Sequence, residues 1–188
     1  RLRASLRELG VSDQTVVWFC SDNGPEGQSG KAPGSAGPLR GRKRSLYEGG
    51  VRVPAIVEWP GTIAAGTTNA AGVTSDFLPT VLELLQLDYP DDRPLDGVSL
   101  VPVITGKASS RSAPIGFQSA KQVAWHSGRF KLYSGDQGKK WELYDLSTDP
   151  AEKTDLAAAR PEFVKELEKQ VTAWQRSCKN SDEGSDYH

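Results

Sequence analysis

A short apolar run followed by a long glycine-rich stretch is the feature that most constrains this chain. Val16 to Cys20 are all apolar and mostly β-branched or aromatic, which predicts a strand over residues 15–20 that is buried on both faces. Residues 2–9 precede it with a helical spacing of leucines that ends at Gly10. A helix, a short turn and a buried strand are typical of an α/β protein with a parallel sheet.

The stretch after this strand, residues 21–50, is rich in glycine and proline and carries a cluster of basic residues. It is too long for an ordinary connection, and loops of this length are often functional. In open α/β sheets ligands bind beyond the carboxyl ends of the strands. We therefore expect a ligand site where this stretch begins.

The remaining chain divides into two parts by its patterns. Residues 1–110 are expected to be part of an α/β domain, with a second strand over 53–59 and a helix over 75–86, followed by loop over 88–114. Residues 111–188 are expected to form a small antiparallel sheet covered by a helix that begins at Pro161. The four strands of that sheet are predicted near 115–118, 121–126, 129–134 and 141–146.

Composition excludes several classes of protein. The chain has 188 residues with 24 acidic and 23 Lys or Arg side chains, a formal net charge of -1, which argues against a nucleic-acid binder. Its longest apolar run, Val16 to Cys20, is far shorter than the roughly 20 residues that span a bilayer, so no membrane span is expected. The chain contains no Met and opens within a predicted helix, which indicates a fragment of a longer protein.

Asp22 and Asn23 directly follow the predicted strand. A carboxylate and an amide oxygen side by side are hard ligands that suit Ca²⁺ or Mg²⁺, and Gly24 allows a sharp turn behind them. An Asp-Asn-Gly turn that only caps a loop is an equally good interpretation of the local pattern.

The basic cluster comprises Arg40, Arg42, Lys43 and Arg44. Such a cluster could bind an anionic ester or could be a solvated loop. Because metal-type ligands and this cationic loop flank the same predicted strand edge, the sequence favours an anion site there.

Three motifs in chain order carry a resemblance to a known family. They are Ser21-Asp22-Asn23-Gly24-Pro25, Gly37-Pro38-Leu39-Arg40-Gly41-Arg42-Lys43 and Tyr47-Glu48-Gly49-Gly50-Val51-Arg52-Val53-Pro54. Together they resemble the type I, formylglycine-dependent sulfatases of the alkaline-phosphatase-like superfamily, and most closely the bacterial branch that acts on sulfated sugars. The resemblance implies part of an alkaline-phosphatase-like α/β sheet with flanking helices, followed by the family's small C-terminal subdomain.

The resemblance also implies roles for three residues. Asp22 and Asn23 match two ligands of the family's divalent metal, usually calcium, with magnesium as the alternative. Lys43 matches the lysine that contacts the sulfate, so it is the expected catalytic and substrate-binding residue. The family's formylglycine arises in a Cys/Ser-x-Pro/Ala-x-Arg motif, and neither Cys20 nor Cys178 lies in one. The nucleophile is therefore expected in an N-terminal half outside this chain, and the fragment alone is expected to be inactive.

The function expected from the resemblance is the hydrolysis of sulfuric esters, on sulfated carbohydrates, by a longer periplasmic or secreted protein. A formylglycine-generating enzyme would be its partner during maturation. Two alternatives stay open: a phosphodiester or phosphonate hydrolase of the same superfamily, and a non-catalytic module that binds a metal or an anion. Cys20 and Cys178 could form a disulfide or be a strand and a tail cysteine that stay free.

Overall fold

The computed structural model describes residues 1–27, 33–89 and 93–187. Contacts between Cα atoms divide the chain into two compact units, each built from separate stretches of sequence. Of the described residues, the first unit contains 1–22, 54–89 and 96–112, and the second contains 23–27, 33–53, 93–95 and 113–187. Residues 33–53, which include Lys43, therefore belong to the same unit as the C-terminal sheet, and a domain boundary at residue 110 stays a prediction.

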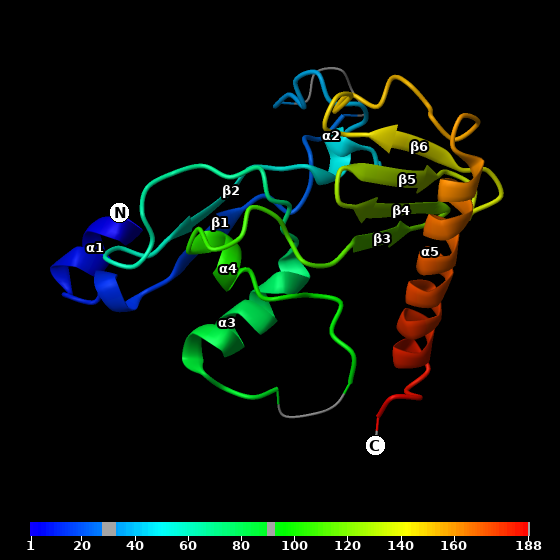
Figure 1. The fold of residues 1–188 in the computed structure, drawn as a ribbon. Coiled ribbons are helices and arrows are strands. Elements are labelled where there is room, and N and C mark those ends of the chain that lie inside the picture. The colour runs from blue at the N-terminus through cyan, green and yellow to red at the C-terminus, as the bar shows by residue number, and fades with distance from the viewer. Residues whose placement is uncertain (28–32, 90–92, 188) are drawn as a thin grey trace. The chain divides into compact units, whose positions relative to one another are not determined.

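The first unit is built from short elements around a two-stranded ribbon (Figure 1). In chain order they are α1 (Leu2–Glu8), the 3₁₀ turn η1 (Ser12–Gln14), β1 (Val17–Cys20), β2 (Ala55–Glu58), the 3₁₀ turn η2 (Thr74–Asp76), α3 (Phe77–Leu85) and α4 (Val101–Ile104). The helix α4 lies where the sequence predicted only loop, because four residues are too few to show a helical period. The other helices and strands fall close to their predicted positions.

The strands β1 and β2 pair antiparallel, with Val17 opposite Glu58 and Cys20 opposite Ala55. For these two strands the expected parallel arrangement was wrong. The connection over residues 21–54 begins and ends at the same end of the ribbon, whereas a parallel pair needs a crossover that returns the chain to the opposite end.

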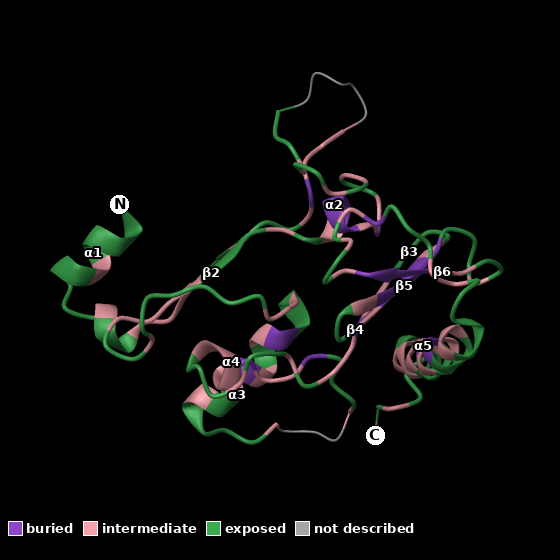
Figure 2. Cartoon of the chain, turned by 45° about the horizontal axis from the view of Figure 1, so that its top comes forward, coloured by how far each residue is buried: buried purple, intermediate pink, exposed green. Residues whose placement is uncertain are grey.

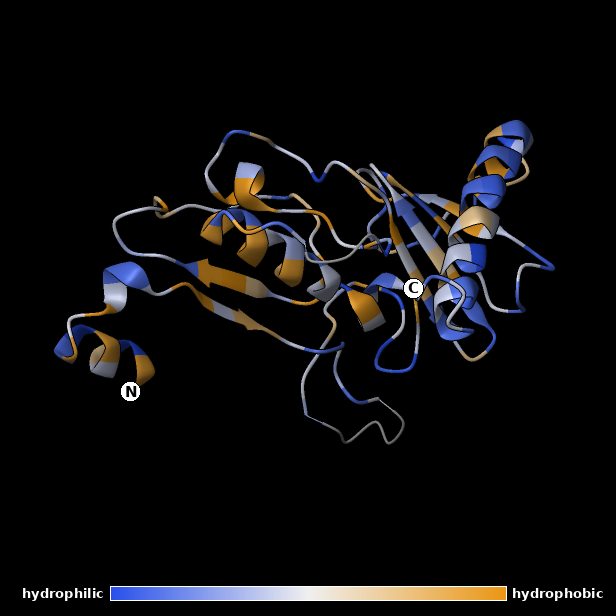
Figure 3. Cartoon of the chain, turned by 90° about the horizontal axis from the view of Figure 1, so that it is seen from below, coloured by the Kyte–Doolittle hydropathy of each residue, from blue (hydrophilic) through white to orange (hydrophobic). Residues whose placement is uncertain are grey.

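One face of this ribbon packs and the other is exposed. The Trp18 ring lies 4.7 Å from the Phe77 ring of α3. Phe19 and Ile56, which are directly paired, have 68% and 59% of their surface exposed, and the ribbon is strongly hydrophobic (Figure 3). Within the described chain β1 is therefore not buried on both faces as the sequence predicted.

A buried ion pair fixes α3 to the segment that follows it. Asp76 is fully buried, and its carboxylate lies 2.7 Å from the Arg111 guanidinium, which is itself almost fully buried. The same carboxylate accepts a hydrogen bond from the Val98 N–H, at 2.8 Å. A buried carboxylate with several donors in fixed directions determines where this segment lies.

The second unit contains the four-stranded antiparallel sheet that the sequence predicted. Its strands lie in chain order and are β3 (Ile115–Ser119), β4 (Gln122–Ser127), β5 (Phe130–Ser134) and β6 (Glu142–Asp145). Tight turns make this order possible, and Gly128 between β4 and β5 has a φ of 58° that glycine adopts without strain. The unit also contains the one-turn helix α2 (Glu48–Val51) and the long helix α5 (Pro161–Asp182).

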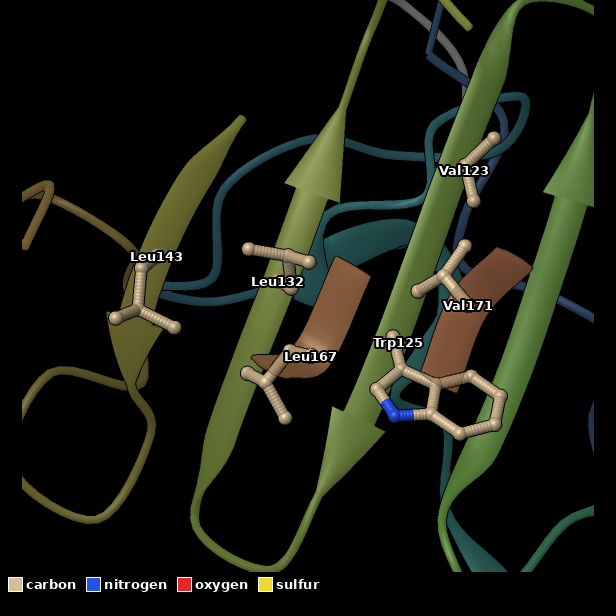
Figure 4. Packing of buried hydrophobic residues seen from close by; sticks show 6 residues of the cluster. All are labelled: Val123, Trp125, Leu132, Leu143, Leu167 and Val171. Carbon is tan, nitrogen blue, oxygen red and sulfur yellow. The ribbon is translucent and has the colours of Figure 1, made fainter. Parts of the chain in front are cut away.

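The helix α5 covers one face of this sheet. Figure 4 shows Leu167 and Val171 of α5 against side chains that the strands direct toward the helix, Val123, Trp125, Leu132 and Leu143. All six are buried. The periodic apolar positions of α5 and the alternation along the strands explain this core.

The other face of the sheet carries a second cluster of buried residues. It consists of Leu46, Ala124, Tyr133 and Tyr144, with Tyr47 and Val51 packed against it. The burial colouring shows buried residues in both α2 and the strands of this sheet (Figure 2). The segment around α2 is thus the cover of this second face.

In the described part of the chain, no helix is long and apolar enough to cross a membrane. Cys20 and Cys178 are both free thiols of intermediate exposure, so the disulfide that the sequence left open is not formed.

Candidate functional site

The first candidate ligands follow β1 directly. Asp22 is exposed, and its carboxylate has no hydrogen-bond or ion-pair partner among the described residues. Asn23 is partly buried, and its side-chain Nδ2 donates a hydrogen bond to the Gly24 carbonyl at 3.0 Å. The chain thus presents a carboxylate and an amide on neighbouring residues at the end of a strand.

Gly24 fixes the backbone next to these ligands. Its N–H donates to the Gly50 carbonyl at 2.8 Å, and a Cβ atom at this position would lie 1.9 Å from the Gly49 carbonyl oxygen. Only glycine allows so close an approach of two backbone segments. One residue further on, the Pro25 carbonyl accepts a hydrogen bond from the Lys43 N–H, at 3.1 Å. The segment that begins at Asn23 therefore lies beside the loop of Lys43, within one unit.

The loop that carries Lys43 packs closely against the backbone of α2. The Gly49 N–H donates to the Arg40 carbonyl at 2.7 Å. A Cβ atom on Gly49 would lie 2.2 Å from the Gly41 carbonyl oxygen, and one on Gly50 would lie 1.9 Å from that of Ser45. The two glycines of α2 are thus required by packing, and the loop over residues 40–50 has a defined conformation.

Among the described residues, the side chains of Arg42 and Arg44 in the basic cluster have partners, whereas the side chain of Lys43 has none. Arg42 donates to the Glu26 carbonyl at 2.8 Å and to the Gly34 carbonyl at 3.0 Å. Arg44 forms an ion pair with the Glu26 carboxylate at 2.7 Å. The Lys43 side chain is exposed and has no partner among the residues that the structure describes. An ammonium without a partner on a well-packed loop is suited to bind an anion.

Arg40 joins the same loop to the sheet. Its guanidinium lies 3.7 Å from the centre of the Tyr47 ring and donates to the Tyr144 hydroxyl at 2.8 Å. Tyr47 and Tyr144 both donate to the Glu142 carboxylate. Burial, followed by the hydrogen bond to Glu142, raises the pKa of Tyr47 and that of Tyr144. These phenols therefore stay protonated near neutral pH and support the loop rather than act as bases.

The donor atoms of Asp22 and Asn23 suit a calcium or magnesium ion, because both elements prefer oxygen ligands. Calcium takes about 6–8 such ligands, so two neighbouring residues supply only part of a set. Within the described ranges, no group of three or more His, Cys, Asp or Glu side chains could hold a metal ion. The chemistry of these two residues fits part of such a ligand set, and their role as metal ligands stays a prediction.

The structure thus brings two of the three predicted site residues, Asn23 and Lys43, into one unit. Asp22 is bonded to Asn23 and is assigned to the other unit. Sequence reasoning missed the buried ionic group of Lys131, Glu48 and Glu152, which lies beneath the loop. A signal was present, since Lys131 interrupts the otherwise apolar and aromatic strand around it.

Comparison with known proteins relates this chain to sulfatases. A family model described as "N-sulphoglucosamine sulphohydrolase, C-terminal" matches residues 41–177. Arylsulfatase A of Homo sapiens is 32% identical over 88% of this chain and 39% of its own length. N-acetylgalactosamine-6-sulfatase of Mus musculus is 36% identical over 79% of the chain and 29% of its own length. The chain thus spans well under half the length of these curated relatives.

Solved structures agree with this relationship. A structure from a study of glycosaminoglycan metabolism by Bacteroides thetaiotaomicron superposes with a TM-score of 0.82 at 27% identity, over 93% of this chain and 42% of that one. A protein solved in complex with its substrate D-glucosamine-2-N,6-O-disulfate superposes with a TM-score of 0.71 at 27% identity, over 97% and 38%. The fold expected from the sequence, part of an alkaline-phosphatase-like α/β domain with a small antiparallel sheet and a helix, is confirmed.

Proposed function

This chain belongs to the family of N-sulphoglucosamine sulphohydrolase C-terminal regions within the type I sulfatases, and we propose that it supplies part of the active site of a sulfuric-ester hydrolase. In this proposal the active enzyme is a longer protein that contains the chain. The observation that carries the proposal is the exposed Lys43, whose side chain has no partner among the described residues and whose loop is held by backbone contacts beside Asn23.

Lys43 is the catalytic residue of this chain in the proposal. When a sulfate ester is hydrolysed, an oxygen nucleophile adds to sulfur, the bond from sulfur to the bridging oxygen breaks, and the alcohol leaves. Negative charge on the sulfuryl oxygens must be stabilised throughout. The Lys43 ammonium would donate to one of these oxygens. Because its loop is already packed, little reorganisation is needed when the charge develops.

Asp22 and Asn23 would hold a divalent cation, calcium in preference to magnesium. A bound divalent cation neutralises charge on a coordinated sulfuryl oxygen. Gly24 would keep the two ligands in place through its hydrogen bond to Gly50. The remaining ligands would come from a part of the protein outside this chain.

The nucleophile would also come from outside the chain. Cys20 and Cys178 are free but are followed by Ser-Asp-Asn and Lys-Asn-Ser, so neither lies in the motif that is converted to formylglycine. A formylglycine-generating enzyme is therefore a proposed partner of the longer protein, and a periplasmic or secreted location is proposed with it.

We propose sulfated sugars as the substrate class. Support comes from the relatives, which include N-acetylgalactosamine-6-sulfatase and the protein solved with a disulfated glucosamine. A sulfated sterol is the competing class, since a steryl-sulfatase of Mus musculus is 36% identical over 68% of this chain.

The test is hydrolysis by the longer protein, expressed with a formylglycine-generating enzyme and supplied with Ca²⁺. Substrates are a chromogenic aryl sulfate, glucosamine 6-sulfate and a phosphonate monoester. Lys43→Ala is expected to lower kcat on the sulfate esters by about 100-fold or more, a typical loss for one oxyanion-stabilising donor. Lys139→Ala removes an exposed lysine of the second unit and is expected to change kcat by less than about twofold.

Three outcomes contradict the proposal in different ways. Turnover of the phosphonate in preference to the sulfates would favour a phosphodiester or phosphonate hydrolase of the same superfamily. Full activity of Lys43→Ala would remove Lys43 from the site. No turnover by a protein shown to carry formylglycine would favour the non-catalytic module.

A further inference from the structure

Lys131 is the second residue of β5 and lies on the face of the sheet that α5 does not cover. Its side chain is 1% exposed. It is paired with His126 of β4 and with Tyr144 of β6. A lysine in the middle of a sheet is rarely buried to this extent unless it has charged partners.

Two carboxylates surround the ammonium of this lysine. Its Nζ lies 2.9 Å from the Glu48 Oε1 atom and 2.9 Å from the Glu152 Oε1 atom. The side chains of Glu48 and Glu152 are 6% and 0% exposed. Arg52 adds a second cation, 3.9 Å from Glu48, so the group contains two positive and two negative side chains.

The group also binds the backbone of α2. The Glu152 Oε2 atom accepts a hydrogen bond from the Glu48 N–H, at 2.7 Å, and the Glu152 carbonyl accepts one from the Arg40 guanidinium, at 3.2 Å. Lys131, Glu48 and Glu152 therefore each have two partners through their charged groups. Buried ion pairs add little to stability compared with apolar packing, but they disfavour arrangements that leave a charge unpaired.

A short path of contacts leads from this group to Lys43. Glu48 is the first residue of α2, and the next residue, Gly49, donates its N–H to the Arg40 carbonyl at 2.7 Å. The Lys43 backbone in turn donates to the Pro25 carbonyl. A shift of α2 on the sheet would therefore move the loop that carries Lys43.

We propose that Lys131 is a positioning residue: by holding Glu48 and Glu152 it fixes α2 on the sheet and so sets the position of the Lys43 ammonium. This inference deepens the proposed function and rests on it. It assigns the C-terminal sheet a role in the site without placing any of its residues on the substrate.

A double-mutant cycle on the longer, formylglycine-bearing protein tests this role. Lys131→Met is expected to lower kcat/KM on the aryl sulfate by about 100-fold, the loss that a misplacement of about 1 Å can cause. In a Lys43→Ala background the same change is expected to cost less than about twofold, because the group that it positions is already absent. Lys121→Met, at an exposed lysine between β3 and β4, is the matched control and should have less than a twofold effect.

Hydrogen exchange provides a reading that does not depend on catalysis. In Lys131→Met the amides of residues 40–50 are expected to exchange at least tenfold faster than in the wild type, while those of β3 keep their rates. If Lys131→Met does not fold, Glu152→Gln, which keeps the shape and removes one charge, takes its place in both measurements.

The outcomes separate the two proposals. If Lys131→Met lowers kcat/KM by the same factor in the wild-type and the Lys43→Ala backgrounds, the positioning role is overturned, because that result would indicate a general effect on the fold. Unchanged exchange over residues 40–50 would overturn it whatever the activity. A wild type without sulfatase activity, but with faster exchange in the variant, would overturn the proposed function and leave the link from Lys131 to the loop intact.

Discussion

Gly24→Ala is the substitution whose effect the structure defines most closely. The new Cβ atom would lie 1.9 Å from the Gly49 carbonyl oxygen and 3.0 Å from the Gly50 Cα atom. Ordinary contact begins at 3.4 Å, so the two segments must separate by about 1.5 Å. The obstructing atoms belong to the backbone and cannot rotate away, so the loop itself has to move.

The cost of this movement can be estimated. The hydrogen bond from the Gly24 N–H to the Gly50 carbonyl would break, which costs about 1 kcal/mol, and overpacking adds about 1–3 kcal/mol. We expect the free energy of unfolding to fall by about 2–4 kcal/mol. The assay is urea unfolding of the 188-residue chain, followed by tryptophan fluorescence, with the slope compared between variants.

Gly66→Ala is the matched control for this experiment. A Cβ atom at Gly66 would meet nothing within 4 Å, and the φ of Gly66 is not in the left-handed region. Its free energy of unfolding should change by less than about 0.5 kcal/mol, or rise slightly. If Gly24→Ala unfolds at the same urea concentration as Gly66→Ala, the close approach of Gly24 to α2 is wrong, and with it the placement of Asn23 beside the Lys43 loop.

Three further changes test the packing of the two units. Leu132→Ala, at a fully buried position, should lower the free energy of unfolding by about 2–5 kcal/mol; a loss below about 1 kcal/mol in urea unfolding would contradict its place in the core. Asp76→Ala removes the carboxylate that pairs with the buried Arg111 guanidinium and should cost about 3–5 kcal/mol in the same assay, whereas a neutral effect would contradict the buried pair. The hydrogen bond from the Ser147 hydroxyl lowers the pKa of Asp145. The ionised carboxylate therefore stabilises the fold at pH values above its unfolded pKa of about 3.9. This stabilisation is lost as the pH falls through the lower pKa of the folded state. Asp145→Asn should therefore make stability less dependent on pH below about 4, and an unchanged acid-unfolding curve would count against that assignment.

Local patterns predicted the longer helices and the strands of this chain, but not the one-turn helices α2 and α4, which lie in expected loops. The helix α5 follows from the spacing of Phe163, Leu167 and Val171, and the four strands of the C-terminal sheet follow from apolar runs between turn residues. Trp125 and Tyr133 on these strands are buried, and Trp141 is partly buried. These features depend on neighbours within a few residues, so a single sequence contains them.

Features that depend on distant residues were not predictable in the same way. The antiparallel pairing of β1 with β2 is set by where the chain returns after residue 54, which local pattern does not show. The contact of Lys131 with Glu48 joins residues 83 positions apart. The sequence showed a lysine within an apolar strand but not which carboxylates surround it.

The site was predicted in part for a similar reason. Motifs placed Asp22, Asn23 and Lys43 as candidates, and their roles stay predictions. Their surroundings came only from the structure: Arg42 and Arg44 are bound within the loop, and Lys43 is left exposed. A basic cluster alone does not reveal which cation is available, because that depends on the carbonyl and carboxylate groups that the folded loop brings near.

The most direct test of the central claim is a crystal structure of the longer protein with Ca²⁺ and a sulfated sugar bound. Calcium is expected within about 2.3–2.6 Å of an oxygen of Asp22 and of Asn23, and the Lys43 Nζ atom within about 3 Å of a sulfate oxygen. A sulfate group bound away from Lys43, or a calcium ion held without Asp22 and Asn23, would contradict it.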